Sequence, residues 1–231
     1  MRPIPNVIWN LFLAVVPVML AFIIARGVRR EREATGHVRW LLWGPLAFVW
    51  LLFLPNSCYL LTEWRHYLDT LTQSQLFAQA RHGGGGRLDF FLVTGFYLVY
   101  SGAGLLAFFL AVWPLDRLTR RRLGWLGAVL RPLIFPLCAL GVYLGLMRGR
   151  FNSWDLVNGS RLPDLLSTVA QMGQRPSVLL PILLFGAVLW LFYAAFDIWM
   201  DGIAWRLSRR HARRAAPLRG QTEGARLPEK D

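Results

Sequence analysis

The chain has 231 residues, of which 55% are hydrophobic and 11 are tryptophan, more large apolar side chains than one soluble core of this size can bury. Its net charge of +13 would suggest nucleic-acid binding in a soluble protein, but here the placement of the basic residues between long apolar runs matters more than their total. Composition therefore excludes an ordinary soluble domain and argues against a nucleic-acid partner. It predicts an all-α, polytopic bundle of membrane helices in contact with membrane lipids.

Five apolar stretches reach or approach the roughly 20 residues that a helix needs to cross the hydrocarbon core of a bilayer. In chain order they are Val7–Ala25, Trp40–Leu61, Asp89–Trp113, Leu133–Met147 and Ser177–Met200. The fourth is the shortest, because Arg131 and Pro132 either end the loop before it or lie inside a longer, kinked helix that starts near Trp125. We expect five spans.

Two stretches between the spans are typical of short helices that lie on the membrane surface, Leu68–Ala80 and Pro163–Met172. Apolar residues in and beside the second recur on one helical face: Leu162, Leu165, Leu166, Val169 and Met172. Residues 1–208 then form a single transmembrane domain. Residues 209–231, which are basic and rich in Arg, Ala, Pro and Gly, are expected to be a disordered cytoplasmic tail.

The basic residues are divided unevenly between the two sides of the predicted bundle. Of the 26 Lys and Arg residues, 18 follow the first, third and fifth spans, and only 8 lie at the N-terminus and in the other two loops. Loops rich in Lys and Arg stay in the cytoplasm. The sequence therefore predicts that the N-terminus is outside and the C-terminus inside.

Two short polar clusters stand out from the apolar runs, Leu54–His66 at the end of the second span and Arg148–Asp155 after the fourth. Acids, amides and a histidine at such positions cost free energy to bury, so they require a partner, an ion or a ligand. With alternating spans both clusters face out of the cytoplasm, as does Asp89 at the start of the third span. We take this face as the candidate site.

The first cluster begins with Pro55 and Asn56, which should break or cap the second span. Three titratable side chains follow at helical i, i+3 spacing: Glu63, His66 and Asp69. They would share one face and provide an acid/base set. The simpler alternative is that Thr62 caps a surface helix whose charged face is only hydrated.

The second cluster contains Asn152 and Asp155 at the spacing of a capping box, although a capping box normally uses Ser or Thr with Glu or Gln. Glycines recur every four residues along the span before it: Gly141, Gly145 and Gly149. Glycines at this spacing allow close helix packing, which by itself explains them. Such packing could also bring the clusters together, so we expect Glu63 or His66 to approach Asn152 or Asp155.

Roles follow from the side-chain chemistry of this joined site. The candidate catalytic residues are Glu63, His66 and Asp155, and the same carboxylates and imidazole would suit a divalent cation such as zinc or manganese. The candidate substrate-binding residues are Asn56, Arg65, Asp89, Arg150, Asn152 and Ser153. Within that set the two guanidinium groups suit a phosphate or carboxylate head group.

Short sequences in both clusters resemble the signature stretches of one family of uncharacterised bacterial integral membrane proteins, domain-of-unknown-function family 1361. They are Leu54-Pro55-Asn56, Tyr59-Leu60, Thr62-Glu63, His66 and Arg150-Phe151-Asn152-Ser153-Trp154-Asp155. Glu63 stands where the family is expected to carry aspartate more often, which keeps a carboxylate and lengthens its reach. The resemblance implies a bacterial inner-membrane location and adds nothing on mechanism.

Two other site types are disfavoured by position. His37 and His211 belong to the cytoplasmic side and His82 to a glycine-rich loop, so no two histidines within the spans could ligate a haem. Cys58 is expected near the outer face and Cys138 about 15 Å below the end of its span, which argues against a disulfide or redox pair.

Three classes of function remain open. An outward-facing transferase or hydrolase acting on a lipid-linked or envelope substrate would explain the gathering of acids, amides and a histidine on one face. A structural or assembly subunit explains them equally well as buried hydrogen-bonding groups. A small transporter is third, because it would carry polar groups nearer the middle of the membrane.

Overall fold

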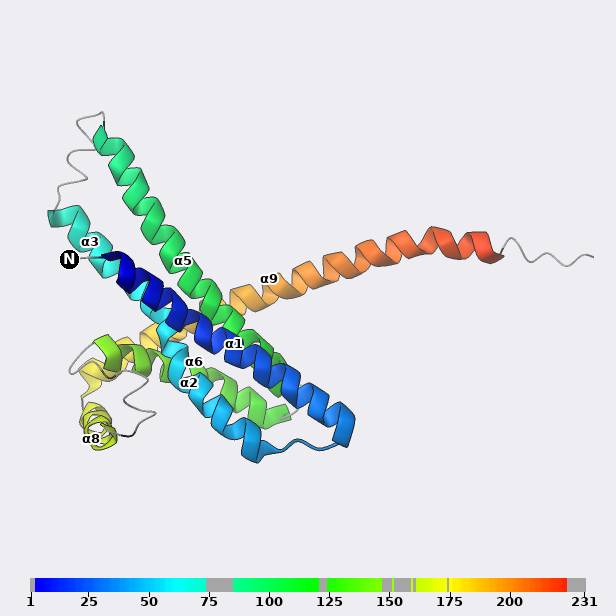
Figure 1. Cartoon of the computed structure of the whole chain (residues 1–231), viewed down its shortest axis with the longest axis horizontal. Coiled ribbons are helices and arrows are strands. Elements are labelled where there is room, and N and C mark those ends of the chain that lie inside the picture. Colours follow the sequence, from blue (N-terminus) through cyan, green and yellow to red (C-terminus); the bar gives the residue numbers. More distant parts are fainter. Residues whose placement is uncertain are drawn as a thin grey trace, which may run out of the picture. The chain divides into compact units, whose positions relative to one another are not determined.

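The computed structural model describes residues 3–73, 85–120, 124–146, 151, 159, 161–173 and 175–223 (Figure 1). Its helices are α1 (Pro3–Thr35), α2 (Trp40–Thr62), α3 (Trp64–Gln73), α5 (Gly85–Arg120), α6 (Gly124–Leu146), α8 (Leu162–Gly173) and α9 (Pro176–Glu223). No strand occurs in these ranges, and the all-α prediction is confirmed.

Four helices are long and apolar enough to cross a membrane, so the chain is a membrane protein. These segments are Val7–Thr35, Trp40–Thr72, Gly86–Arg120 and Pro176–Arg209, and the apolar segment Arg131–Leu146 is shorter. The fourth predicted span is thus the one that falls short on length. It belongs to the longer helix α6. Of the two alternatives for Arg131 and Pro132, the structure has the one in which both lie inside a longer helix.

The chain divides into two compact units, Met1–Trp190 and Leu191–Asp231. The first unit holds α1 to α8 and the beginning of α9. The second is the remainder of α9, whose backbone is helical through Glu223. The disordered tail expected from residue 209 stays a prediction. Residues 224–231 lie outside the described ranges.

The turn between α1 and α2 is held by Glu31. Its carboxylate accepts hydrogen bonds from the indole Nε1 of Trp43 at 2.6 Å and from the backbone N–H of Arg39 at 3.3 Å, and it pairs with the Arg39 side chain. Gly36 ends the helix at φ 72°, a conformation that suits glycine. The indole of Trp43 covers Gly27, where any side chain would overlap it.

Helix α2 lies in the middle of the first unit and contacts α1, α5 and α6. It runs antiparallel to α5, because Trp50 Nε1 donates to the carbonyl of Ala111 at 3.1 Å while Gly104 lies against Ser57 and Leu60. The hydroxyl of Ser57 also donates to the carbonyl of Ala14 at 3.3 Å and so joins α2 to α1. A glycine at position 104 is required because a Cβ there would lie 2.8 Å from the Ser57 carbonyl oxygen.

Helices α2 and α6 run parallel. Pro55 lies over Gly141 and Tyr59 lies over Gly145, so that each step of four residues on one helix matches a step of four on the other. The predicted close packing is confirmed at these two glycines, and Gly149 lies outside the described residues. The prediction that Pro55 and Asn56 break the second span is wrong: α2 continues through both to Thr62. Pro55 is tolerated there because membrane helices accommodate proline where neighbouring helices pack closely.

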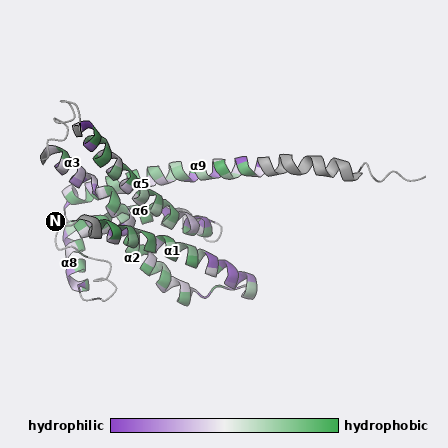
Figure 2. Ribbon diagram, turned by 45° about the horizontal axis from the view of Figure 1, so that its top comes forward, coloured by the Kyte–Doolittle hydropathy of each residue, from purple (hydrophilic) through white to green (hydrophobic). Residues whose placement is uncertain are grey.

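The hydropathy of the helices matches this arrangement (Figure 2). Apolar residues line most of α1, α2 and α5, and hydrophilic residues gather at the C-terminal end of α1. Of the two predicted surface helices, the helix over Pro163–Met172 is present as α8, with Leu162 and Leu166 exposed, and its place at the membrane surface stays a prediction. The other forms from Trp64 to Gln73 as α3, and the rest of the predicted stretch lies outside the described residues.

Candidate functional site

The packing places the ends of several helices at one end of the first unit. α6 runs parallel to α2, so Leu146 lies at the same end as Thr62. α5 is antiparallel to α2 and begins at this end. α9 also begins there. Gly186 packs against Pro136, since a Cβ at Gly186 would lie 3.0 Å from the Pro136 backbone, and Val178, nearer the start of α9, lies with Tyr143, nearer the end of α6.

Glu63 is the single non-helical residue between α2 and α3, and its side chain is partly buried. It lies close enough to the hydroxyl group of Tyr100 on α5 to act on it electrostatically, as does Tyr97. Tyr100 is only 5% exposed and packs with Ala14 and Leu60. Glu63 makes no ion pair and no side-chain hydrogen bond with any other described residue.

Aromatic side chains fix α3 beside this carboxylate. The hydroxyl groups of Tyr67 and Thr94 are hydrogen-bonded at 2.8 Å, which joins α3 to α5. The ring of Tyr67 meets those of Trp64 and Tyr97 at centroid distances of 5.0 and 5.4 Å. Tyr67 is 6% exposed and is the side chain through which α3 is anchored. The turn at Glu63 is therefore a fixed part of the structure.

The other described residues of the predicted site face outward. Arg65, His66 and Asp69 on α3 are exposed, and so is Asp89 on α5. His66 and Asp69 therefore do not share the partly buried position of Glu63. Asn56 lies about two turns before Glu63 on α2, where it is partly buried and takes part in an interaction. Within the described ranges no three His, Cys, Asp or Glu side chains are grouped so that they could bind a metal ion.

The second cluster is described only at Phe151. This residue is 7% exposed, and the guanidinium group of Arg161 lies 4.7 Å from the centre of its ring. Arg150, Asn152, Ser153 and Asp155 lie outside the described residues, so the approach of the two clusters stays a prediction. What the structure adds is that α6, which leads into this cluster, ends beside the end of α2.

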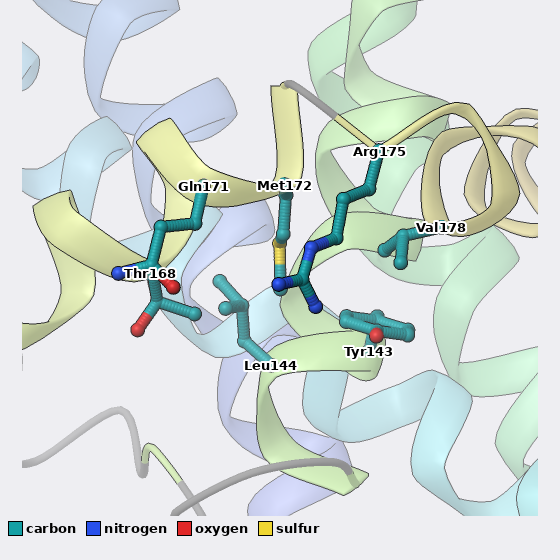
Figure 3. A pocket seen from close by; sticks show the side chains of 7 residues that line it. All are labelled: Tyr143, Leu144, Thr168, Gln171, Met172, Arg175 and Val178. Carbon is teal, nitrogen blue, oxygen red and sulfur yellow. The ribbon is translucent and has the colours of Figure 1, made fainter.

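Sequence reasoning missed a cavity of about 190 Å³ at this same end, between α6, α8 and the start of α9 (Figure 3). Its polar lining residues are Tyr143, Thr168, Gln171 and Arg175. One signal could have indicated it. Arg175 is one of the few basic residues on the arginine-poor side of the predicted topology, and it stands directly before Pro176, where a helix begins.

A buried ion cluster at the other end of the bundle was also missed. The side chain of Asp116 on α5 is fully buried and pairs with Arg120 at 2.8 Å and with Arg131 on α6 at 3.7 Å. The sequence analysis treated these arginines only as topology signals. Their pairing with one carboxylate links α5 to α6 and explains why α6 tolerates an arginine in its first half.

The expected separation of the two cysteines is wrong. Cys58 Sγ and Cys138 Sγ lie 3.5 Å apart, and both free thiols are fully buried between α2 and α6. The prediction counted the depth of each cysteine from the end of its own span, Leu61 for Cys58 and Met147 for Cys138. That count omits the packing of α2 against α6, which brings the two thiols together between the helices.

The sequence model of one protein family matches residues 9–192, which include all four long apolar segments in whole or in part. The chain belongs to the DUF1361 family of proteins of unknown function. The match ends just after the first structural unit, so the DUF1361 region comprises α1 to α8 and the first part of α9. No curated protein and no solved structure matches the chain.

Proposed function

We propose that this DUF1361 protein is a multi-pass protein of the bacterial inner membrane with a polar site on its extracytoplasmic face. The site acts as a transferase or hydrolase on a lipid-linked or cell-envelope substrate. The observation that supports the proposal is the parallel packing of α2 on α6 through Gly141 and Gly145, because it brings the end of α6, the helix that precedes the second cluster, beside the end of α2, which leads into the first.

The orientation rests on charge. In the predicted topology, 8 of the 26 basic residues lie on the same side as Glu63 and the other 18 on the opposite side, which the positive-inside rule assigns to the cytoplasm. Successive long helices alternate in direction, as five spans with an outer N-terminus require. α6 has 23 residues, about 35 Å of helix, which is long enough to cross the hydrocarbon core of a bilayer as the fourth of the five spans.

Glu63 is the described residue best suited to acid/base chemistry. It is a partly buried carboxylate near enough to the Tyr100 hydroxyl group to act on it electrostatically, on a turn that is anchored through Tyr67. We propose that it transfers the proton, and that His66 and Asp155 complete the catalytic set, with or without a divalent cation. Arg65, Arg150 and the amide of Asn152 would hold the substrate.

A structural or assembly subunit is the second candidate. It is favoured by the exposure of His66, Asp69 and Asp89, since outward-facing polar groups at the membrane surface suit a protein partner as well as a substrate.

Mass spectrometry of lipids and lipid-linked intermediates tests the choice between them. In cells that lack the gene, we expect one lipid-linked species to accumulate. Expression of the wild-type protein or of Glu63→Asp in these cells should remove it. Glu63→Gln should not remove it, although the variant is present in the membrane at the normal level. The exposed Glu33→Gln serves as the control. If Glu63→Gln restores the wild-type profile, or if deletion leaves the profile unchanged, the enzymatic proposal is wrong.

A further inference from the structure

Among the described residues that line the cavity between α6, α8 and α9, one is charged, Arg175. Figure 3 shows the Arg175 side chain extending into the cavity between Met172 and Tyr143, with Gln171 and Thr168 on the side opposite its origin. None of the described lining residues is acidic. The guanidinium group makes no ion pair or hydrogen bond with any described residue. An exposed arginine that has no counter-charge in the described part of the chain, beside a cavity with neutral hydrogen-bonding groups, favours an anion.

The backbone around Arg175 is fixed. Its N–H donates to the carbonyl of Met172 at 2.9 Å, and its own carbonyl accepts from the N–H groups of Val178 and Leu179 at 2.9 and 3.3 Å. The nearest acid on α8 is Asp164, whose side chain already lies 3.9 Å from the guanidinium of Arg161. Arg175 is therefore presented to the cavity on a defined turn.

The remaining wall is apolar and consists of Leu144, Met172 and Val178. α8, which covers the cavity, exposes Leu162 and Leu166 by 45% and 62%, as a helix does when it lies in the membrane interface. A ligand at this position meets a cation, neutral polar groups and an apolar wall together. The volume, about 190 Å³, is below the roughly 300–1,000 Å³ of pockets that enclose drug-sized ligands, so it accepts a head group and not a whole lipid.

We propose that this cavity binds a phosphate group through Arg175, with Gln171, Thr168 and Tyr143 as further hydrogen-bonding partners. The chemistry is shared by two sources, a phosphate-bearing lipid head group and a free phosphate. The inference deepens the proposed function and rests on it only for the link to a reaction: Arg175 would hold the phosphate of a lipid-linked substrate at the same end of the bundle as Glu63.

Binding is measured with the purified full-length protein in detergent micelles, by the fluorescence anisotropy of phosphatidic acid that carries a dye on its acyl chain. Arg175→Gln should weaken binding about tenfold or more, the size expected for the loss of a charge-assisted hydrogen bond, and Arg175→Lys should retain part of it. The matched control is Arg161→Gln, which removes a positive charge on the same side of α8 without touching the cavity. Gln171→Leu is a second cavity variant with an unchanged charge, and it should also weaken binding.

Competition distinguishes the two sources. If unlabelled phosphatidic acid displaces the probe and millimolar inorganic phosphate does not, the site takes a lipid head group; if inorganic phosphate displaces it equally well, the site takes free phosphate. Equal binding by wild type, Arg175→Gln and Gln171→Leu would overturn the proposal, as would an equal loss in Arg161→Gln. Glu63→Gln should bind the probe like wild type, so a failure of the catalytic proposal leaves this result unaffected.

Discussion

The phenol of Tyr59 on α2 lies directly over Gly145 on α6, where a side chain of any size would overlap its hydroxyl oxygen. The same hydroxyl reaches the carbonyl of Gly141 one turn earlier, at 3.5 Å. This contact sets the register of two parallel helices, and the register decides which polar residues can meet at their ends.

Gly145→Ala should therefore destabilise the protein. The added methyl group forces Tyr59 out of its position, and overpacking of this kind costs about 1–3 kcal/mol. The midpoint of thermal unfolding in detergent should fall. Gly95→Ala on α5 is the matched control, because nothing lies within 4 Å of a Cβ at that position, and it should leave the midpoint unchanged or raise it. An equal midpoint for wild type and Gly145→Ala would refute the register.

Substitutions at Gly27 and Trp43 should have non-additive effects on the free energy of unfolding. Gly27→Ala alone overlaps the indole ring and should destabilise the protein by about 1–3 kcal/mol. In a Trp43→Ala background the same change should cost little, because the overlapping ring is gone. A double-mutant cycle of unfolding free energies measures the difference. Additive effects would mean that the indole does not lie over Gly27.

Cys58 and Cys138 should be joined by mild oxidation, because their sulfur atoms are 3.5 Å apart. A protease site inserted between His82 and Gly83 separates α2 from α6 after cleavage. We expect the two fragments to stay together on a non-reducing gel after treatment with a membrane-permeant oxidant, and to separate on reduction. Cys138→Ala must abolish the link. Fragments that separate before reduction in the oxidised wild type would contradict the packing.

Asp116 should be needed for stability. Its carboxylate is fully buried and pairs with Arg120 and Arg131, so Asp116→Ala leaves two partly buried cations without their counter-charge. Removing one partner of a fully buried pair costs about 3–5 kcal/mol, and since about a third of each arginine side chain is exposed, we expect a smaller loss of about 1–3 kcal/mol. The exposed Glu33→Ala is the control for thermal unfolding. Similar midpoints for both variants would contradict a structural role for Asp116.

Long apolar runs were read correctly from the sequence because a membrane span depends on length and composition alone. The runs that became α1, α2, α5 and α9 needed no knowledge of their neighbours, and the glycine spacing indicated the packing face of α6. Features that depend on a partner helix could not be predicted. Pro55 looks like a helix break until Gly141 is known to lie beneath it, and the distance between Cys58 and Cys138 follows only from the register of two helices.

The candidate site shows the same contrast between features that one segment determines and features that depend on neighbouring helices. Glu63 could be singled out from the sequence because a carboxylate at the end of a span is unusual in itself, and its catalytic role stays a prediction. The Arg175 cavity was missed because its walls come from three helices, and neither Tyr143 nor Gln171 has a distinctive sequence context. Asp116 was missed because the neighbouring arginines were counted for topology and not for pairing.

The central claim is that the end of the bundle with Glu63 and the Arg175 cavity faces away from the cytoplasm. Single cysteines test it most directly, in a Cys58→Ala, Cys138→Ala background, at three exposed positions: His66, Leu162 and Arg39. In spheroplasts, a membrane-impermeant maleimide should label His66→Cys and Leu162→Cys, and should label Arg39→Cys only after permeabilisation. The opposite pattern would reverse the orientation, and labelling of only one of the first two would place Glu63 and the cavity on different sides of the membrane.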